Sequence, residues 1–219
     1  MPRPKFSDDL RAQKREQILD AAMAVFEKEG GEEALSFRRL ATELGLSYSA
    51  PYRYFVDKQE LVNALRARAF RWIEAEMRGA IVGLSEPEKQ LESLAAAYIR
   101  SGMAHPHRYA LMFFALDQLE VARRSIELKA AKRDALDVCT QVIAAGQARG
   151  NFPLDIDPLT ASHLFWIGAH GLVSLQVAGQ FVMGCDVKML VPTLIHALRT
   201  GLEHADTSAK VPSKEKRHG

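Results

Sequence analysis

Residues 37–58, FRRLATELGLSYSAPYRYFVDK, decide the fold of the first part of this chain. Apolar residues at helical spacing early in this stretch predict a short helix. Gly45 follows directly, where helices commonly end in the left-handed conformation that Gly adopts without steric cost. Ser47 or Ser49 can then cap a second helix, with Pro51 in or near its first turn. Two short helices joined by such a turn are typical of a helix-turn-helix, whose second helix enters the major groove of DNA.

The side chains of the second predicted helix suit contact with DNA. Small residues let the backbone approach the groove, while tyrosine hydroxyls and arginine donate to phosphates or base edges. The pattern leaves open a solvated polar helix in an ordinary helical protein. The candidate DNA contacts on this helix and the turn before it are Ser47, Tyr48, Ser49, Ala50, Tyr52, Arg53 and Tyr54.

Residues 15–65 resemble the N-terminal domain of TetR-family transcriptional regulators. Three segments carry the resemblance in order and spacing: ILDAAMAVFEKEG (18–30), SFRRLATELGLS (36–47) and PYRYFVDKQELVNAL (51–65). The resemblance implies a DNA-binding, usually dimeric regulator. It also implies an all-helical ligand-sensing domain behind the helix-turn-helix.

Four further residues are candidate contacts to the DNA backbone. Ser36 is a good N-cap, and the resemblance implies that a residue at this place also meets phosphate. Arg38 and Arg39 follow at the start of that helix, although either can be a plain surface charge. The resemblance also implies a phosphate contact from Lys58, at the start of the next long helix.

Composition sets wide bounds on the class of protein. The chain has 219 residues, 47% of them hydrophobic, so it can bury a sizeable core. Its net charge of +2 is too small to indicate nucleic acid by itself. Two widely separated cysteines form neither a zinc framework nor a disulfide scaffold, and the first residues lack an apolar signal core. We therefore expect a cytoplasmic protein.

Apolar periodicity and capping signals predict an all-α fold of about nine helices. We expect a three-helix helix-turn-helix domain over residues 10–58, a larger helical ligand-binding and dimerisation domain over 59–204, and a disordered tail over 205–219. Residues 158–185 contain no Asp, Glu, Lys or Arg. A membrane span is the weaker interpretation of that stretch, because His and Gln residues interrupt it; a helix buried on two sides is simpler.

The second half resembles the WHG-type C-terminal domain of some TetR-family regulators. Trp166, His170 and Gly171 carry this resemblance, together with the Pro106 to Phe113 run. The resemblance implies a ligand cavity, whereas a packed core built from the same residues is the alternative. The candidate ligand-binding residues are Tyr98, Met103, Tyr109, Met112, Phe113, Trp166 and His170.

The uncharged stretch and the last helix also predict a homodimer. Leucines supply buried area and small residues let helices come close, so two helices from each subunit can form a four-helix interface with two-fold symmetry. The candidate interface residues are Leu164, Gly168, Leu172, Leu175, Leu194, Leu198 and Leu202.

No motif for catalysis stands out in the sequence. We find no phosphate-binding Gly-rich loop, HExxH or Gly-x-Ser-x-Gly elbow, and His163 and His170 lie two helical turns apart, too far to share one metal ion comfortably. We therefore expect no cofactor and no metal. The leading hypothesis is a transcriptional repressor that a small apolar or weakly polar effector releases from a double-stranded DNA operator. The alternative is a helical-bundle enzyme acting on a small hydrophobic molecule.

Overall fold

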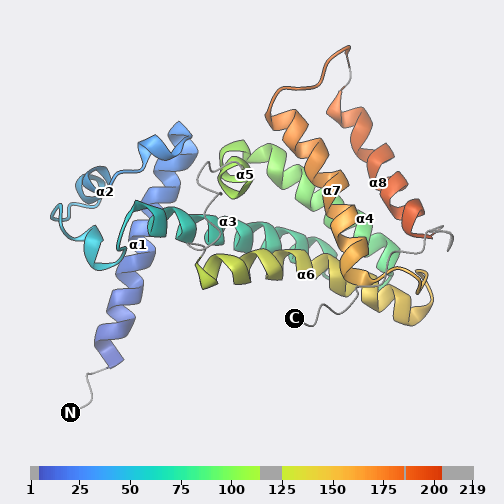
Figure 1. Ribbon diagram of the computed structural model, residues 1–219, viewed down its shortest axis with the longest axis horizontal. Coiled ribbons are helices and arrows are strands. Elements are labelled where there is room, and N and C mark those ends of the chain that lie inside the picture. Colours follow the sequence, from blue (N-terminus) through green and yellow to red (C-terminus); the bar gives the residue numbers. More distant parts are fainter. Residues whose placement is uncertain (1–4, 114–124, 185, 204–219) are drawn as a thin grey trace, which may run out of the picture.

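The computed structural model describes residues 5–113, 125–184 and 186–203. Their regular secondary structure is helical, with no strand among the described residues (Figure 1). The all-α prediction is confirmed. The tail predicted for 205–219 lies outside the described residues. The elements in chain order are α1 (Lys5–Glu29), η1 (Glu32–Ala34), α2 (Phe37–Glu43), η2 (Pro51–Arg53), α3 (Lys58–Ile81), α4 (Pro87–Ala104), α5 (Pro106–Phe113), α6 (Ile126–Arg149), α7 (Pro158–Val177) and α8 (Val187–Glu203).

Helix α3 is the central element of the fold. It packs against α1 near its beginning and against α4, α5 and α6 along its length. Helices α1 and α2 lie at one end of the molecule, and α7 and α8 lie at the other, packed against α4 (Figure 1). One continuous apolar core runs through both ends, and α3 extends between them.

Side-chain caps explain where several helices begin. Ser36 Oγ accepts the backbone N–H of Arg39 at 3.2 Å, as expected for an N-cap. Asp57 and Asp157 cap α3 and α7 in the same way. Pro158 follows at the first helical position of α7, where its missing N–H costs nothing. The local sequence therefore determines these boundaries without help from tertiary packing.

The second helix of the helix-turn-helix is shorter than the sequence predicts. Gly45 ends α2 with φ +62°, as expected, but residues 48–50 form turns and only Pro51–Arg53 is helical, as a 3₁₀ turn. Neither Ser47 nor Ser49 caps it through its side chain. Pro51 has no N–H to donate to the carbonyl of Ser47, and that carbonyl instead accepts from Ala50 N at 2.9 Å. The predicted α-helix is therefore replaced by consecutive tight turns.

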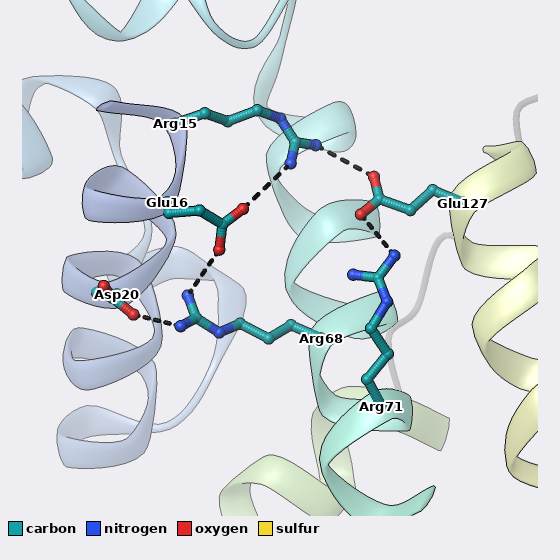
Figure 2. A network of polar contacts seen from close by, with 6 residues as sticks. All are labelled: Arg15, Glu16, Asp20, Arg68, Arg71 and Glu127. Atoms are coloured by element: carbon teal, nitrogen blue, oxygen red, sulfur yellow. Dashed lines mark hydrogen bonds and ion pairs between the residues drawn. The ribbon is translucent and has the colours of Figure 1, made fainter. Parts of the chain in front are cut away.

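An ion-pair network joins α1 to α3 and α6 (Figure 2). Glu127, in the first turn of α6, accepts from Arg15 of α1 at 3.2 Å and from Arg71 of α3 at 2.9 Å. Arg68 of α3 pairs with Asp20 of α1. Glu127 thus bridges the helix-turn-helix end of the chain and the larger helical part.

Glu127→Gln is expected to lower the free energy of unfolding only slightly, by about 1 kcal/mol or less, because partly exposed ion pairs are weak. The loss should shrink further at high salt, which screens the pairs. Chemical denaturation at two salt concentrations measures both effects. Asp155→Asn, which removes a charge from the exposed α6–α7 loop, is the control. A loss that does not depend on salt would show that Glu127 acts through packing.

Candidate functional site

Four predicted DNA contacts line one shallow surface hollow between the starts of α2 and α3. Ser36 and Arg38 come from the beginning of α2, Tyr52 from η2, and Lys58 from the first residue of α3. Arg38, Tyr52 and Lys58 are exposed. The hollow therefore presents hydroxyl, guanidinium and ammonium donors on one side of the molecule, as contact with phosphates requires.

The turn before η2 projects further donors next to that hollow. Tyr48 and Tyr52 are 60% and 61% exposed, whereas tyrosine side chains are usually at least partly buried. The Arg38 guanidinium lies over the Tyr48 ring at 5.6 Å, and the Tyr52 ring meets Phe37 edge-on at 4.6 Å. These contacts orient both tyrosines. Ser49 is exposed beside them, so the prediction that this turn contacts bases is compatible with its exposure.

Other predicted DNA contacts are less available. The Arg39 guanidinium forms two hydrogen bonds with the Glu29 carboxylate. This pairing raises the pKa of Arg39 and lowers the pKa of Glu29. Arg39 therefore ties α2 to the end of α1, and contact with phosphate requires it to leave Glu29. Ala50 and Tyr54 are half-buried, whereas Ser47 and Arg53 are exposed. The role of each residue at DNA stays a prediction.

A cavity of about 500 Å³ lies in the larger helical part, between α3, α4, α5, α6 and α7. Its surface is mostly apolar, as is typical of sites for small hydrophobic molecules. Of the predicted ligand-binding residues, four line it: Tyr98, Met112, Phe113 and Trp166. The other three, Met103, Tyr109 and His170, are not among the lining residues.

Tyr109 and His170 form a polar cluster next to the cavity. The Tyr109 hydroxyl lies 2.5 Å from His170 Nδ1, and Ser174 Oγ lies 3.2 Å from His170 Nε2. Burial lowers the pKa of His170 and raises the pKa of Tyr109. Both groups are therefore neutral near pH 7, and they bond to each other and to α7 instead of facing the cavity.

Comparison with known proteins decides the family. The family described as bacterial regulatory proteins, tetR family, matches residues 18–65, and the tetracyclin repressor-like C-terminal domain matches residues 91–198. The transcriptional repressor NicS of Pseudomonas putida is 32% identical over 146 residues, covering 65% of this chain and 67% of NicS. The repressor Rv1474c of Mycobacterium tuberculosis is 30% identical over 168 residues, covering 70% of this chain and 79% of the relative. This chain belongs to the TetR family of transcriptional regulators.

The fold of this TetR-family regulator also matches a solved structure. A protein of unknown function from Rhodococcus sp. RHA1 superposes with a TM-score of 0.75 at 26% identity, covering 86% of this chain and 95% of that one. The family resemblance stated from the sequence is confirmed. The chain is thus a DNA-binding regulator, whose site residues are assigned below as proposals.

Several residues of the cavity were not predicted from the sequence. Phe70, Ile73 and Met77 belong to an apolar stripe of α3, and helical spacing does not distinguish a cavity wall from a packed core. Lys132 and Cys139 line it from α6, a helix to which no ligand role was given. Burial raises the pKa of the Cys139 thiol to about 12, so this thiol is neutral and unreactive.

A buried arginine connects α3 to the cavity wall. Arg66 is almost fully buried, and its Nη2 donates to the carbonyl oxygen of Met112 at 3.1 Å. Met112 lines the cavity at the end of α5. This hydrogen bond connects α5 to α3, the helix that begins at the hollow between α2 and α3. Nothing in the sequence pattern marked Arg66, because an arginine in a helix is usually a surface residue.

The outer side of α7 is apolar and uncovered in the single chain. Leu164, Ile167 and Leu175 are all exposed, with Ile167 at 60%. Gly171 lies on the same side by helical spacing, and a Cβ added there would meet no atom within 4 Å. On α8 the exposed residues include Met189, Thr193, His196 and Ala197. We refer to these α7 and α8 residues as the outer α7–α8 face.

Some predicted dimer residues belong to the core of their own chain. Leu172 and Leu202 are only 7% and 6% exposed. Leu198 packs onto Gly168, so closely that a Cβ on Gly168 would lie 2.8 Å from Leu198 Cδ2, and Leu194 is half-buried. The apolar stripe of α8 covers α4 and α7 of the same chain, whereas the sequence assigned it to a partner. We therefore move the proposed interface to the outer α7–α8 face.

Within the described residues, no three His, Cys, Asp or Glu side chains are grouped so that they could hold a metal ion. His163 is exposed and its Nδ1 lies 2.7 Å from the Leu159 carbonyl, one turn earlier in α7. His170 faces Tyr109 instead. None of the helices in the described part of the chain is long and apolar enough to cross a membrane.

Lys58→Ala is expected to weaken binding to every DNA duplex alike, because the residue is assigned to a phosphate. It should also reduce the slope of log affinity against log salt by about one unit. Fluorescence anisotropy at several salt concentrations measures the slope. Lys188→Ala removes the same charge from α8, at the far end of the molecule, and should leave the slope unchanged. An unchanged slope in Lys58→Ala would show that Lys58, at the start of α3, does not contact the DNA backbone.

Proposed function

We propose that this TetR-family regulator is a repressor that leaves its operator when a small apolar or weakly polar effector fills the cavity. The DNA contacts lie around the hollow between α2 and α3, and the effector site is the cavity behind α5. Two conformations of the regulator with different affinities for DNA would be enough for release from the operator. An effector that binds one of them more tightly shifts the population towards that one.

One observation supports this proposal most strongly: a single helix takes part in both sites. Lys58 is the first residue of α3 and lines the hollow, while Phe70, Ile73 and Met77 of the same helix line the cavity. A helix is stiff over such a length, so displacement of its second half by a ligand also displaces its beginning. In this proposal, α3 couples repression to effector binding without a further moving part.

The proposal includes a homodimer formed through the outer α7–α8 face. Exposed leucine and isoleucine side chains on α7 supply apolar area, and Gly171 allows close approach of a second helix. A dimer with two-fold symmetry would present two hollows to successive major grooves, about 34–36 Å apart. The spacing of the two hollows is then the quantity that the effector changes.

The lining of the cavity defines the class of effector. Its surface is mainly aromatic and aliphatic, which favours a neutral, partly aromatic or aliphatic molecule. Lys132 and Arg133 also belong to the lining and admit one acidic group at their side of the cavity. The Lys132 ammonium lies 5.4 Å from the centre of the Phe70 ring. A molecule with several charges would have to desolvate them against apolar walls.

The proposed coupling is tested by reciprocity. Apolar compounds are first selected because they raise the melting temperature of the regulator, as any ligand of the native state does. Each compound is then titrated with and without operator DNA, and the DNA with and without the compound. An effector must weaken DNA binding by the same factor by which DNA weakens its own binding. Compounds that stabilise the protein through the cavity but leave DNA affinity unchanged would contradict the proposal.

A further inference from the structure

One tyrosine of the cavity wall holds its hydroxyl in a buried polar cluster. Tyr98 of α4 lines the cavity and is only 5% exposed. Its hydroxyl receives the indole N–H of Trp166 at 3.1 Å, and it lies near the pair formed by Tyr109 and His170. Three helices, α4, α5 and α7, therefore fix the position of this oxygen.

The hydroxyl proton of Tyr98 has no acceptor at normal hydrogen-bond distance among the described residues. Indole N–H can only donate, so the Tyr98 oxygen accepts from Trp166. The remaining acceptors within reach are the Tyr109 oxygen at 3.4 Å and His170 Nδ1 at 3.3 Å. Hydroxyl donors normally approach an acceptor oxygen to 2.5–3.0 Å. His170 Nδ1 is moreover engaged by the much closer Tyr109 hydroxyl, at 2.5 Å.

The Tyr98 hydroxyl keeps its proton over the physiological pH range. Burial raises the pKa of Tyr98 well above its ordinary value, so the phenol is neutral over the physiological range. His170 is also neutral, because burial lowers its pKa. Tyr98 is thus a neutral phenol at the wall of an apolar cavity. Its oxygen accepts from Trp166, and its proton has only distant acceptors among the described residues.

We propose that the Tyr98 hydroxyl donates to a carbonyl oxygen of the effector, which defines the effector as an apolar ketone, ester or amide. This inference rests on the proposed function, since it names the ligand class of the same cavity. A carbonyl group accepts a hydrogen bond without bringing a proton or a charge of its own. It therefore completes the bonding of Tyr98 at little desolvation cost, and the rest of the molecule fills the apolar remainder.

The dye Prodan tests this proposal directly. Prodan is a naphthalene ketone without N–H or O–H groups, and its emission moves to longer wavelength when its carbonyl accepts a hydrogen bond. Tyr98→Phe keeps the ring and removes the hydroxyl, so bound Prodan should emit at shorter wavelength and bind about two- to tenfold more weakly. Thr140→Val is the matched control, because it removes a half-buried hydroxyl that bonds to Ser162 and belongs to a residue that does not line the cavity.

The outcomes separate this proposal from the proposed function. A wavelength shift and weaker binding in Tyr98→Phe, with Thr140→Val close to wild type, support the donor assignment. Equal spectra for wild type and Tyr98→Phe, or equal changes in both variants, overturn the donor assignment. The proposal that the cavity is the effector site is then unaffected. If wild type does not bind Prodan, the assignment of an apolar ketone falls. If Cys139→Phe in the cavity wall binds Prodan as well as wild type, the cavity is not the ligand site and both proposals fall.

Discussion

Ile167→Glu is expected to yield a monomer that binds a two-half-site operator at least about 100-fold more weakly than wild type. A dimer gains about this much affinity because its second subunit binds the second half-site at a high effective concentration. Ile167 is exposed near the middle of the outer α7–α8 face. In the proposed dimer a carboxylate there would be desolvated without a partner, at a cost of several kcal/mol. Sedimentation measures the mass, and anisotropy with the operator measures the affinity.

Ile167 is a better position for this experiment than Leu198. Leu198 packs onto Gly168 within its own chain, so a charge there would also damage the single subunit. Leu154→Glu, at an exposed apolar position in the α6–α7 loop, is the matched control and should remain dimeric. A wild-type monomer at micromolar concentration would contradict the proposed interface, as would an Ile167→Glu protein that stays dimeric.

Cys139→Phe is expected to abolish the effector response and to leave operator binding intact. Cys139 lines the cavity from α6, and a phenyl ring there occupies space that the effector needs. We expect the affinity for a cavity ligand to fall by about 100-fold or more, since overlap of two groups cannot be relieved in a close-packed wall. Calorimetry with a selected compound gives the affinity, and anisotropy gives the DNA binding that remains.

Ala144→Phe provides the control for that variant. Ala144 is on the exposed side of the same helix, so the added ring enters solvent and the response should persist. Loss of operator binding in Cys139→Phe together with a lowered melting temperature would indicate damage to the fold. In that case Ala135→Leu, a smaller enlargement of the same wall, replaces it. An effector response retained by folded variants of both kinds would place the effector elsewhere.

Local chemistry in the sequence was sufficient for the fold class and for several helix boundaries. Ser36, Gly45 and Asp157 determine helix ends through their own side chains or backbone freedom, so these boundaries follow without tertiary information. The shortened second helix was missed. The sequence places Pro51 in or near the first turn of that helix, yet its missing N–H also prevents the turn before it from joining the helix.

Partners across the fold were harder to predict than helix positions. Helical spacing shows which residues share a side of a helix but not which neighbour covers that side. The leucines of α8 therefore seemed available for a second subunit, although Leu202 is buried in its own chain. Arg39 seemed free for phosphate, although Glu29 of α1 holds it. Similarly, Tyr109 and His170 were placed in the cavity, whereas they bond to each other.

The most direct test of the account is a salt-dependent anisotropy titration with the DNA upstream of the chain's own gene. A shuffled duplex of the same composition serves as the reference. We predict that the upstream duplex binds about 1,000-fold or more tightly than the shuffled one at physiological salt, and that both affinities fall as salt rises. Equal affinity for the two duplexes at every salt concentration would contradict sequence-specific regulation through the hollow between α2 and α3.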